Sequence, residues 1–387
     1  MDTKYIDELL KHITEIGPAG CSLLVSKDGK PVYENQAGFA DLAGGKPVDE
    51  TTLFRMYSNT KVVTVIAAMI LLERGKFLLN DPVSDYLPYF KDMSYYKYGA
   101  NNVAVIVPAQ NPITISNLLS MTSGITYAGD QIPTQKNIGD AIDVVSFFPR
   151  NMTVQEFAKI ISDVPLAFEP GTRFHYGYSH DIVAALIEVV SGKSFAEFLN
   201  DEIFEPLEMV DTSFSVSAAN RDRLAVLYQR HDGELVPNTE DDFRLDPGYK
   251  FDSGGGGLIS TVRDMEKISR CLCMSEPVLS APTIELMRRN QLTTPALMDS
   301  LRDTFELGWD FFRGYGYGLG VRVILDPAEA GTICTMGEFG WAGAAGTWAL
   351  IDRNCGLSVF YAHQLMPENM EGYCQPRLRN AIYAAFG

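Results

Sequence analysis

The two ends of the chain carry matching strand patterns, and this feature constrains the fold more than any other. Near the N-terminus, CSLLVSKDGKPVYENQAGFAD alternates around Asp28-Gly29, a strong signal for a tight turn between strands near 21–27 and 30–38. Near the C-terminus, GTWALIDRNCGLSVFYAHQL predicts a strand, a turn over 352–356 and another strand. The outermost segments, MDTKYIDELLKHITEIG and RLRNAIYAAFG, have the pattern of helices. The economical arrangement is one antiparallel sheet built from both chain ends, with the terminal helices on one face.

The chain between these ends is mostly helical. Apolar residues recur with a spacing near 3.6 in five segments, which we expect to be helices: 61–74, 153–162, 181–191, 194–203 and 262–273. Three long stretches lack this periodicity and are expected to be loops: 91–112, 124–151 and 228–257. Loops of this length often carry function.

We find no linker that would separate two independent units, so the helical part reads as an insertion. We therefore predict an α+β fold with two parts. Residues 1–80 and 250–387 would form a discontinuous α/β sheet domain, and residues 81–249 a mainly helical domain.

Composition and charge argue against several classes of protein. The chain has 387 residues, enough for a large core, and a formal net charge of -17, which argues against a nucleic-acid partner. No apolar run reaches membrane-spanning length, and the N-terminus lacks the basic and apolar regions of a signal peptide. The six cysteines show no metal-like spacing, and the five histidines give no zinc signature. We therefore expect a cytoplasmic protein with reduced thiols, no metal site and no membrane insertion.

Ser58 and Lys61 stand at the head of the apolar stretch FRMYSNTKVVTVIAAMILLERGKF and are the first candidates for chemistry. A helix places residues i and i+3 one turn apart on the same face, so these side chains would meet at a helix N-terminus. The helix dipole favours a developing negative charge there, and a lysine that enters a dry core has a lowered pKa. A neutral lysine beside a serine hydroxyl is a workable activated nucleophile. An ordinary helix cap is the simpler alternative and stays open at this point.

Three other serine patterns compete with this one and are weaker. The spacing Ser-x-x-Lys recurs at Ser94 and Lys97, in a polar and aromatic loop with no helix to bury the lysine. The segment GYSHD resembles a nucleophile elbow, but Asp181 stands where that motif ends in Gly, and no apolar strand precedes it. DSGGGG (252–257) resembles the serine segment of trypsin-like proteases, whose double barrel does not suit so helical a chain. Its glycines are more simply a flexible loop.

Five segments together resemble, in order, the serine β-lactamases, the penicillin-binding proteins and their esterase relatives, above all the class C-like branch. FRMYSNTKVVTVIAAMILLERGKFLLNDPVSDYLP (54–88) resembles the Ser-x-x-Lys segment of that family. FEPGTRFHYGYSHDIVAALIEVVSGKSFAEFLNDEIFEPLEM (168–209) resembles the segment of its catalytic tyrosine, and FGWAGAAGTWALIDR (339–353) the strand of its Lys-Thr-Gly motif. ITISNLLSMTSGI and DSGGGGLISTVRDMEKI match two further stretches.

This resemblance covers most of the chain and implies a β-lactamase/transpeptidase-like fold. Such a fold has an antiparallel sheet flanked by helices from both chain termini, plus a helical insertion. The active site would lie in the cleft between the sheet part and the inserted helices. The implied chemistry is acyl transfer through a serine acyl-enzyme, which needs no metal or organic cofactor.

The resemblance also assigns catalytic roles, residue by residue. Ser58 matches the nucleophile, Lys61 the lysine that manages its proton, and Tyr176 the tyrosine that shuttles a proton to the leaving group. The oxyanion hole would use the backbone N–H groups of Ser58 and Ala344. Gly343, in the Trp-Ala-Gly motif on what we expect to be an edge strand, would let the backbone approach the substrate. A phenol needs positive neighbours to be useful near neutral pH, and Lys61 is one candidate.

Four residues are expected to line the substrate cleft: Trp341, Gly343, Tyr178 and His180. A core or rim aromatic is an equally open interpretation of Trp341. For His180 the alternative is a surface or capping residue ahead of the helix at 181–191. Tyr127 lies on a loop that would roof the site, and we leave it outside the predicted site because solvated loop aromatics are common.

Two departures from the family pattern bear on the substrate. The family usually carries Tyr-x-Asn, whose Asn holds a substrate amide, but here the third residue is Tyr178. Trp341 replaces the lysine that helps bind a substrate carboxylate. We therefore expect a carboxylesterase or acyltransferase that acts on small ester or acyl substrates. The alternatives are a β-lactamase or D-amino-acid peptidase, or a catalytically silent binding protein on the same fold. The oligomeric state stays open.

Overall fold

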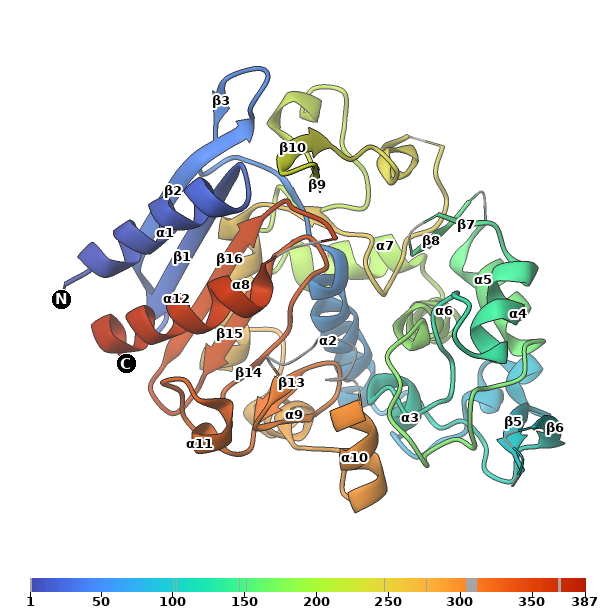
Figure 1. The fold of residues 1–387 in the computed structure, drawn as a ribbon. Coiled ribbons are helices and arrows are strands. Elements are labelled where there is room, and N and C mark those ends of the chain that lie inside the picture. The colour runs from blue at the N-terminus through green and yellow to red at the C-terminus, as the bar shows by residue number, and fades with distance from the viewer. Residues whose placement is uncertain are drawn as a thin grey trace.

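One large antiparallel sheet organises the fold (Figure 1). The computed structural model describes residues 2–387 except 100, 102, 146, 151, 247, 276, 304–311, 368 and 369. Within this part of the chain the sheet has eight strands in the order β12-β13-β14-β15-β16-β1-β2-β3. The bounds of its strands are β1 (Gly20–Lys27), β2 (Lys30–Asp41), β3 (Lys46–Pro47), β12 (Tyr315–Tyr317), β13 (Arg322–Ile324), β14 (Phe339–Gly340), β15 (Trp348–Asp352) and β16 (Leu357–His363).

The two chain ends meet in the middle of this sheet. β1 pairs antiparallel with β16, with Val25 opposite Val359, and β1 also pairs with β2. The turn between β1 and β2 places Asp28 and Gly29 at positive φ, as its sequence predicts. The predicted sheet, built from one hairpin at each chain end, is confirmed.

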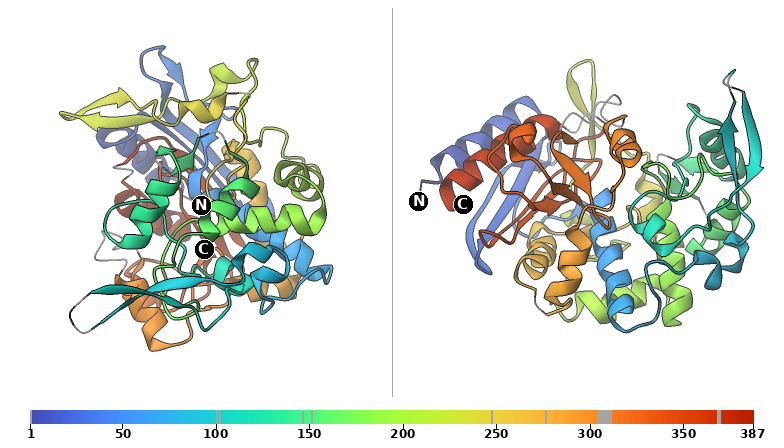
Figure 2. Two further views of the ribbon diagram at one scale, coloured as in Figure 1. Left: turned by 90° about the vertical axis from the view of Figure 1, so that its right-hand side faces the viewer. Right: turned by 90° about the horizontal axis from the view of Figure 1, so that it is seen from below.

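Helices cover both faces of the sheet. α1 (Lys4–Ile16) and α12 (Glu371–Phe386) lie side by side over one face, where Val25 belongs to the apolar cluster that they bury (Figures 1 and 2). α8 (Val262–Met274) packs against β1, β15 and β16 on the other face. Leu24 of β1 belongs to the larger apolar cluster on that side of the sheet. Side chains alternate between faces along a strand, so one strand serves both clusters.

Helix α2 (Thr60–Glu73) runs through the larger core, and its residues from Thr60 to Leu71 are all buried. It packs against α6 (Ser179–Ser191). The same core takes in residues of the sheet and of the inserted helices, such as Phe360 and Ile182, so the two parts share one apolar interior. A helix that is buried all round has no polar face, which explains the almost unbroken apolar run after Lys61.

All five predicted helices are present, and several shorter elements accompany them. They are α2, α5 (Val154–Ser162), α6, α7 (Phe195–Leu199) and α8. The structure also contains α3 (Ile115–Leu119), α4 (Pro133–Ala141), α9 (Ala281–Arg288), α10 (Pro295–Asp303) and α11 (Pro327–Ala330). α7 continues as a π-helical turn, η4 (Asn200–Phe204). The 3₁₀ turns are η1 (Tyr57–Asn59), η2 (Val83–Asp85), η3 (Pro88–Phe90), η5 (Arg221–Arg223) and η6 (Asp242–Leu245).

The three stretches predicted to be loops contain regular structure, so that prediction was wrong in detail. Each holds a two-stranded hairpin: β5 (Ser94–Tyr98) with β6 (Ala104–Pro108), β7 (Val144–Val145) with β8 (Phe148–Pro149), and β9 (Tyr228–His231) with β10 (Glu234–Pro237). Another short pair joins β4 (Phe54–Arg55) to β11 (Ile259–Ser260). β4, β7, β8 and β11 have two residues each, too few for an alternating pattern.

The division into a sheet domain and a helical domain remains a prediction. Part of the range assigned to the helical domain contacts the sheet side, because Leu224 bridges to Leu53 and Tyr228 bridges to Leu365. In the described residues, none of the helices has the length and apolar character needed to cross a bilayer.

Candidate active site

The turn that carries Ser58 is held between the small β4–β11 sheet and helix α2. β4 ends at Arg55, Met56 donates its N–H to the Leu258 carbonyl at 2.9 Å, and Tyr57 adopts a positive φ of 45°. A non-glycine residue in this left-handed region costs energy and persists only where surrounding contacts impose it. Asn59, rather than Ser58, occupies the N-cap of α2, and it forms no side-chain cap. The capping alternative for Ser58 is therefore not what the structure shows.

Lys61 lies fully buried under Ser58, and three oxygen atoms surround its amine. The Nζ atom is 3.2 Å from Ser58 Oγ, 2.9 Å from the Tyr127 hydroxyl and 2.6 Å from the Gly255 carbonyl oxygen. Burial lowers the pKa of Lys61 to about 7, although the charge of nearby Asp181 acts in the opposite direction. The amine can therefore exist in neutral form near neutral pH.

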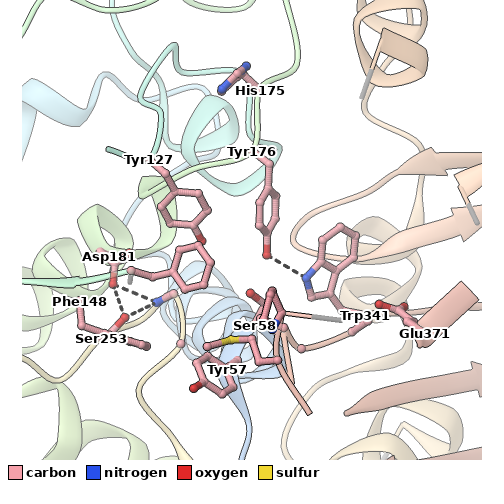
Figure 3. Close-up of a pocket in the computed structure, with 18 of the residues that line it drawn as sticks. Tyr57, Ser58, Tyr127, Phe148, His175, Tyr176, Asp181, Ser253, Trp341 and Glu371 are labelled. Atoms are coloured by element: carbon pink, nitrogen blue, oxygen red, sulfur yellow. Dashed lines mark hydrogen bonds between the residues drawn. The ribbon is translucent and has the colours of Figure 1, made fainter. Parts of the chain in front are cut away.

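Tyr176 stands above Ser58 and accepts a hydrogen bond from Trp341. The indole Nε1–H of Trp341 donates to the Tyr176 hydroxyl at 3.0 Å (Figure 3). The Lys61 amine is 4.7 Å from the centroid of the Tyr176 ring. Burial raises the pKa of Tyr176 above its ordinary value, while hydrogen bonds with the Ser58 and Trp341 side chains lower it. Tyr176 is thus a protonated phenol at neutral pH, because the effect of burial outweighs that of these hydrogen bonds.

Trp341, Gly343 and Ala344 lie in the turn between β14 and β15 rather than on an edge strand. β14 ends at Gly340 and is an interior strand, so the predicted edge-strand placement was wrong. The hydroxyl of Thr347 donates to the Met56 carbonyl at 3.1 Å, which ties this turn to the one that carries Ser58. A Cβ atom at Gly343 would overlap the same Met56 carbonyl oxygen, so only glycine permits this approach.

A pocket of about 510 Å³ opens over Ser58, between the sheet part and the inserted helices. Figure 3 shows Ser58 below Tyr127 and Tyr176, with Trp341 beside them. Aromatic rings supply much of its wall: Tyr57, Tyr127, Phe147, Phe148, Tyr176, Phe312 and Trp341. Its charged lining residues among those described are the acids Asp181 and Glu371. His175 also lines it, and burial together with the nearby Arg173 charge lowers the pKa of His175 to about 4.

Most of the predicted site residues converge on this pocket. Ser58, Tyr176, Trp341, Gly343 and Ala344 line it, and Lys61 contacts Ser58 from below.

Tyr178 and His180 do not line the pocket, so their prediction as substrate contacts is not supported. Tyr178 is buried against Tyr127 and Phe157, with ring centroids 4.6 and 5.0 Å away. His180 is also fully buried, so it is no surface residue either, and its Nε2 lies 3.3 Å from the Leu119 carbonyl oxygen. Burial lowers the pKa of His180 to about 3, and the Lys61 charge adds to this effect.

Sequence reasoning missed four residues that complete the site. Tyr127, left outside the predicted site, contacts the Lys61 amine, and Asp181, Ser253 and Gly255 form a hydrogen-bonded group beside it. The DSGGGG segment is therefore a buried, hydrogen-bonded turn rather than a flexible loop. Two sequence features pointed to these residues: Asp181 ends the segment GYSHD, and Tyr127 closely follows MTSGI. Neither pattern predicts which residue its side chain contacts.

Comparison with known proteins fits this geometry. A family model described as Beta-lactamase matches residues 6–383. The chain belongs to the Beta-lactamase family. Esterase EstB of Burkholderia gladioli is 29% identical over 388 residues, which cover 94% of this chain and 91% of EstB.

Similar solved structures give the same picture. EstCE1, a hydrolase with promiscuous acyltransferase activity, is 26% identical with a TM-score of 0.82, and the match covers 98% of each chain. Simvastatin synthase (LovD) from Aspergillus terreus has a TM-score of 0.84 over 100% of this chain and 99% of its own, at 21% identity. The likeness to LovD supports the fold alone. The predicted β-lactamase/transpeptidase-like fold is confirmed.

Proposed function

We propose that this Beta-lactamase family member is a serine hydrolase that cleaves small esters through an acyl-enzyme, as a carboxylesterase or acyltransferase. One observation carries the proposal: Ser58 Oγ lies 3.2 Å from a buried lysine amine, beneath a tyrosine whose hydroxyl accepts a hydrogen bond from Trp341. The names of EstB and EstCE1, an esterase and a hydrolase with acyltransferase activity, support the same reaction class.

The contacts of the Lys61 amine suit a base that takes the proton of Ser58. A neutral amine has two N–H donors and one lone pair. The Gly255 carbonyl can only accept, and the Tyr127 hydroxyl can accept as well, so the lone pair is left for the Ser58 hydroxyl. After protonation the amine has three donors for the same three oxygens. Both protonation states are therefore accommodated without a change of partners.

In the proposed acylation step, Ser58 Oγ bonds to the ester carbonyl carbon while its proton passes to Lys61. When the bond to the leaving alcohol breaks, Tyr176 gives that oxygen its phenolic proton and regains one from the Lys61 ammonium. The raised pKa of Tyr176 suits this role, because the residue starts as a proton donor. The Trp341 hydrogen bond orients the hydroxyl and stabilises the phenolate as it forms.

We assign the oxyanion hole to the backbone N–H groups of Ser58 and Ala344, which both line the pocket. Two donors aimed at the developing oxyanion typically account for orders of magnitude in rate. Gly343 lets the Ala344 turn approach the nucleophile closely. Water or an acceptor alcohol then attacks the acyl carbonyl, with Lys61 as base, and Ser58 is released with its proton restored.

The pocket wall favours ester substrates over β-lactams. Trp341 replaces a lysine of the family motif, and among the described lining residues no Lys or Arg is present to hold a carboxylate. His175 does not supply that charge either, because its lowered pKa keeps it neutral. Tyr178, in place of the motif Asn, is buried and offers no amide group to the pocket.

The experiment compares wild type with Ser58→Ala on p-nitrophenyl acetate and butyrate and on nitrocefin. We expect wild type to turn over the esters and to be labelled once, at Ser58, by a fluorophosphonate probe, as mass spectrometry of the protein would show. Ser58→Ala should lose both properties. Unchanged ester turnover by Ser58→Ala would overturn the assignment. Faster turnover of nitrocefin than of esters would favour a β-lactamase, and stoichiometric acylation without turnover a silent binding protein.

A further inference from the structure

The buried carboxylate of Asp181 lies in the first turn of α6, beside the base of the proposed reaction. It is 1% exposed, and its Oδ1 atom accepts a hydrogen bond from Ser253 Oγ at 2.6 Å and another from the Gly255 N–H at 3.0 Å (Figure 3). Two donors on one oxygen are the environment of an ionised carboxylate rather than of a carboxylic acid. Nothing in the mechanism described above uses this group.

A single residue, Gly255, connects Asp181 to Lys61. Gly255 donates its N–H to the Asp181 carboxylate, and its carbonyl oxygen accepts from the Lys61 amine at 2.6 Å. The chain here passes so close to α6 that a Cβ atom at Gly255 would lie 2.6 Å from Asp181 Oδ2. The hydroxyl of Ser253 also accepts from the Gly255 N–H at 3.2 Å. The carbonyl that faces the base is thus fixed by the acid behind it.

We propose that Asp181 is a positioning residue of the acyl-transfer site, which holds the Gly255 carbonyl against the Lys61 amine and supplies the buried negative charge that favours the ammonium form. Ser253 is the clamp that fixes the Asp181 carboxylate. The inference rests on the proposed function, because it assigns to Asp181 control over when Lys61 acts as a base.

The other titratable groups around Lys61 leave this control to Asp181. Tyr127 and Tyr176 are neutral phenols whose pKa values burial raises, and His180 is neutral because burial lowers its pKa to about 3. Burial raises the pKa of Asp181, and the Lys61 charge and the bonds from Ser253 and Gly255 reduce this rise. The Asp181 charge raises the pKa of Lys61 against the effect of burial. Removal of that charge should therefore let Lys61 lose its proton at lower pH.

The test is the pH profile of kcat/KM on a p-nitrophenyl ester for wild type, Asp181→Asn and Ser253→Ala. Asparagine keeps the shape and one acceptor oxygen of Asp181 but removes the charge. We expect the acid limb of Asp181→Asn to move to lower pH by about one unit. Its plateau should fall about tenfold, because a small misplacement of a catalytic group slows the reaction. Ser253→Ala keeps the charge, so its plateau should fall while its acid limb stays in place.

Asp264→Asn is the matched control. Asp264 is another buried aspartate with hydrogen bonds to backbone and hydroxyl donors, but it lies on α8, away from the pocket lining. Its replacement should change thermal stability without moving the acid limb. Circular dichroism melting shows whether each variant is folded, and fluorophosphonate labelling counts the reactive sites in each preparation.

An acid limb of Asp181→Asn that stays in place or moves to higher pH, at any plateau height, would overturn the inference. The proposed function would still stand in that case, because wild type labels and turns over. If wild type neither labels at Ser58 nor hydrolyses esters, the proposed function fails and this inference falls with it. The two failures are therefore distinguishable.

Discussion

Replacement of Lys61 by methionine is expected to stabilise the fold at neutral pH while it abolishes acyl transfer. Burial lowers the pKa of Lys61 to about 7 in the folded state, whereas an unfolded lysine titrates near 10.4. Between these values the unfolded chain binds more protons than the folded chain, so the stability contribution of Lys61 rises with pH. Burial of Lys61 therefore lowers the free energy of unfolding. This deficit has its full size below the folded pKa and disappears above the unfolded pKa. A lysine stabilised by a salt bridge would instead raise the free energy of unfolding.

The two pKa values set the size of this effect. The linkage relation gives a deficit of about 4 kcal/mol at pH 7 and about 2 kcal/mol at pH 9. Methionine has a similar length and no charge. The stability advantage of Lys61→Met over wild type should therefore shrink by about 2 kcal/mol between pH 7 and pH 9. Loss of the lysine also raises the pKa of the buried Asp181, and that variant then loses stability as pH rises. Both effects act in the same direction.

The assay is urea unfolding at pH 7, 8 and 9, followed by circular dichroism. Lys76→Met is the control, because Lys76 is exposed just beyond the end of α2 and should show no such pH-dependent difference. A stability difference between Lys61→Met and wild type that is equal at pH 7 and pH 9 would refute the reasoning, because the Lys61 amine would then titrate alike in both states.

Three other predictions concern activity. With a base whose pKa is about 7, kcat/KM on a p-nitrophenyl ester should be about tenfold lower at pH 6 than on its plateau, and a flat profile from pH 5.5 to 8.5 would exclude Lys61 as the base. Trp341→Phe removes one buried hydrogen bond worth about 1 kcal/mol, so kcat should fall about fivefold, with ester KM little changed; an unchanged kcat would show that the indole N–H does not assist Tyr176. Gly343→Ala should drive the turn away from Met56, lower the melting temperature and lower kcat at least about tenfold, and wild-type kcat would argue against Ala344 as an oxyanion donor.

The parts of the site that are local in sequence could be predicted, and the parts that depend on distant contacts could not. Ser58 and Lys61 are three residues apart at the start of a helix, so helical geometry alone brings them together. Tyr127 and Gly255 reach the same amine from 66 and 194 residues away along the chain. Only the fold makes those contacts, and a tyrosine or a glycine in a polar segment gives no sign of them.

The sheet and the predicted loops show the same division. The strands of the two terminal hairpins are long enough for their pattern and turn residues to be recognised, so their pairing followed from the economy of a single sheet. β7 has two residues, too few for any periodicity. His180 shows the reverse error: a polar residue at the start of a helix suggests exposure, but this helix begins inside the core, where neutral imidazole is tolerated.

The pairing of β1 with β16 has a consequence for how the protein is made. Residues 20–27 find their central partner at residues 357–363, so every residue between them must be synthesised before the middle of the sheet can close. Contacts between segments this far apart form late and slow the search for the native state. A nascent chain should therefore need protection from aggregation until β16 has been synthesised, and it should gain esterase activity only after that point.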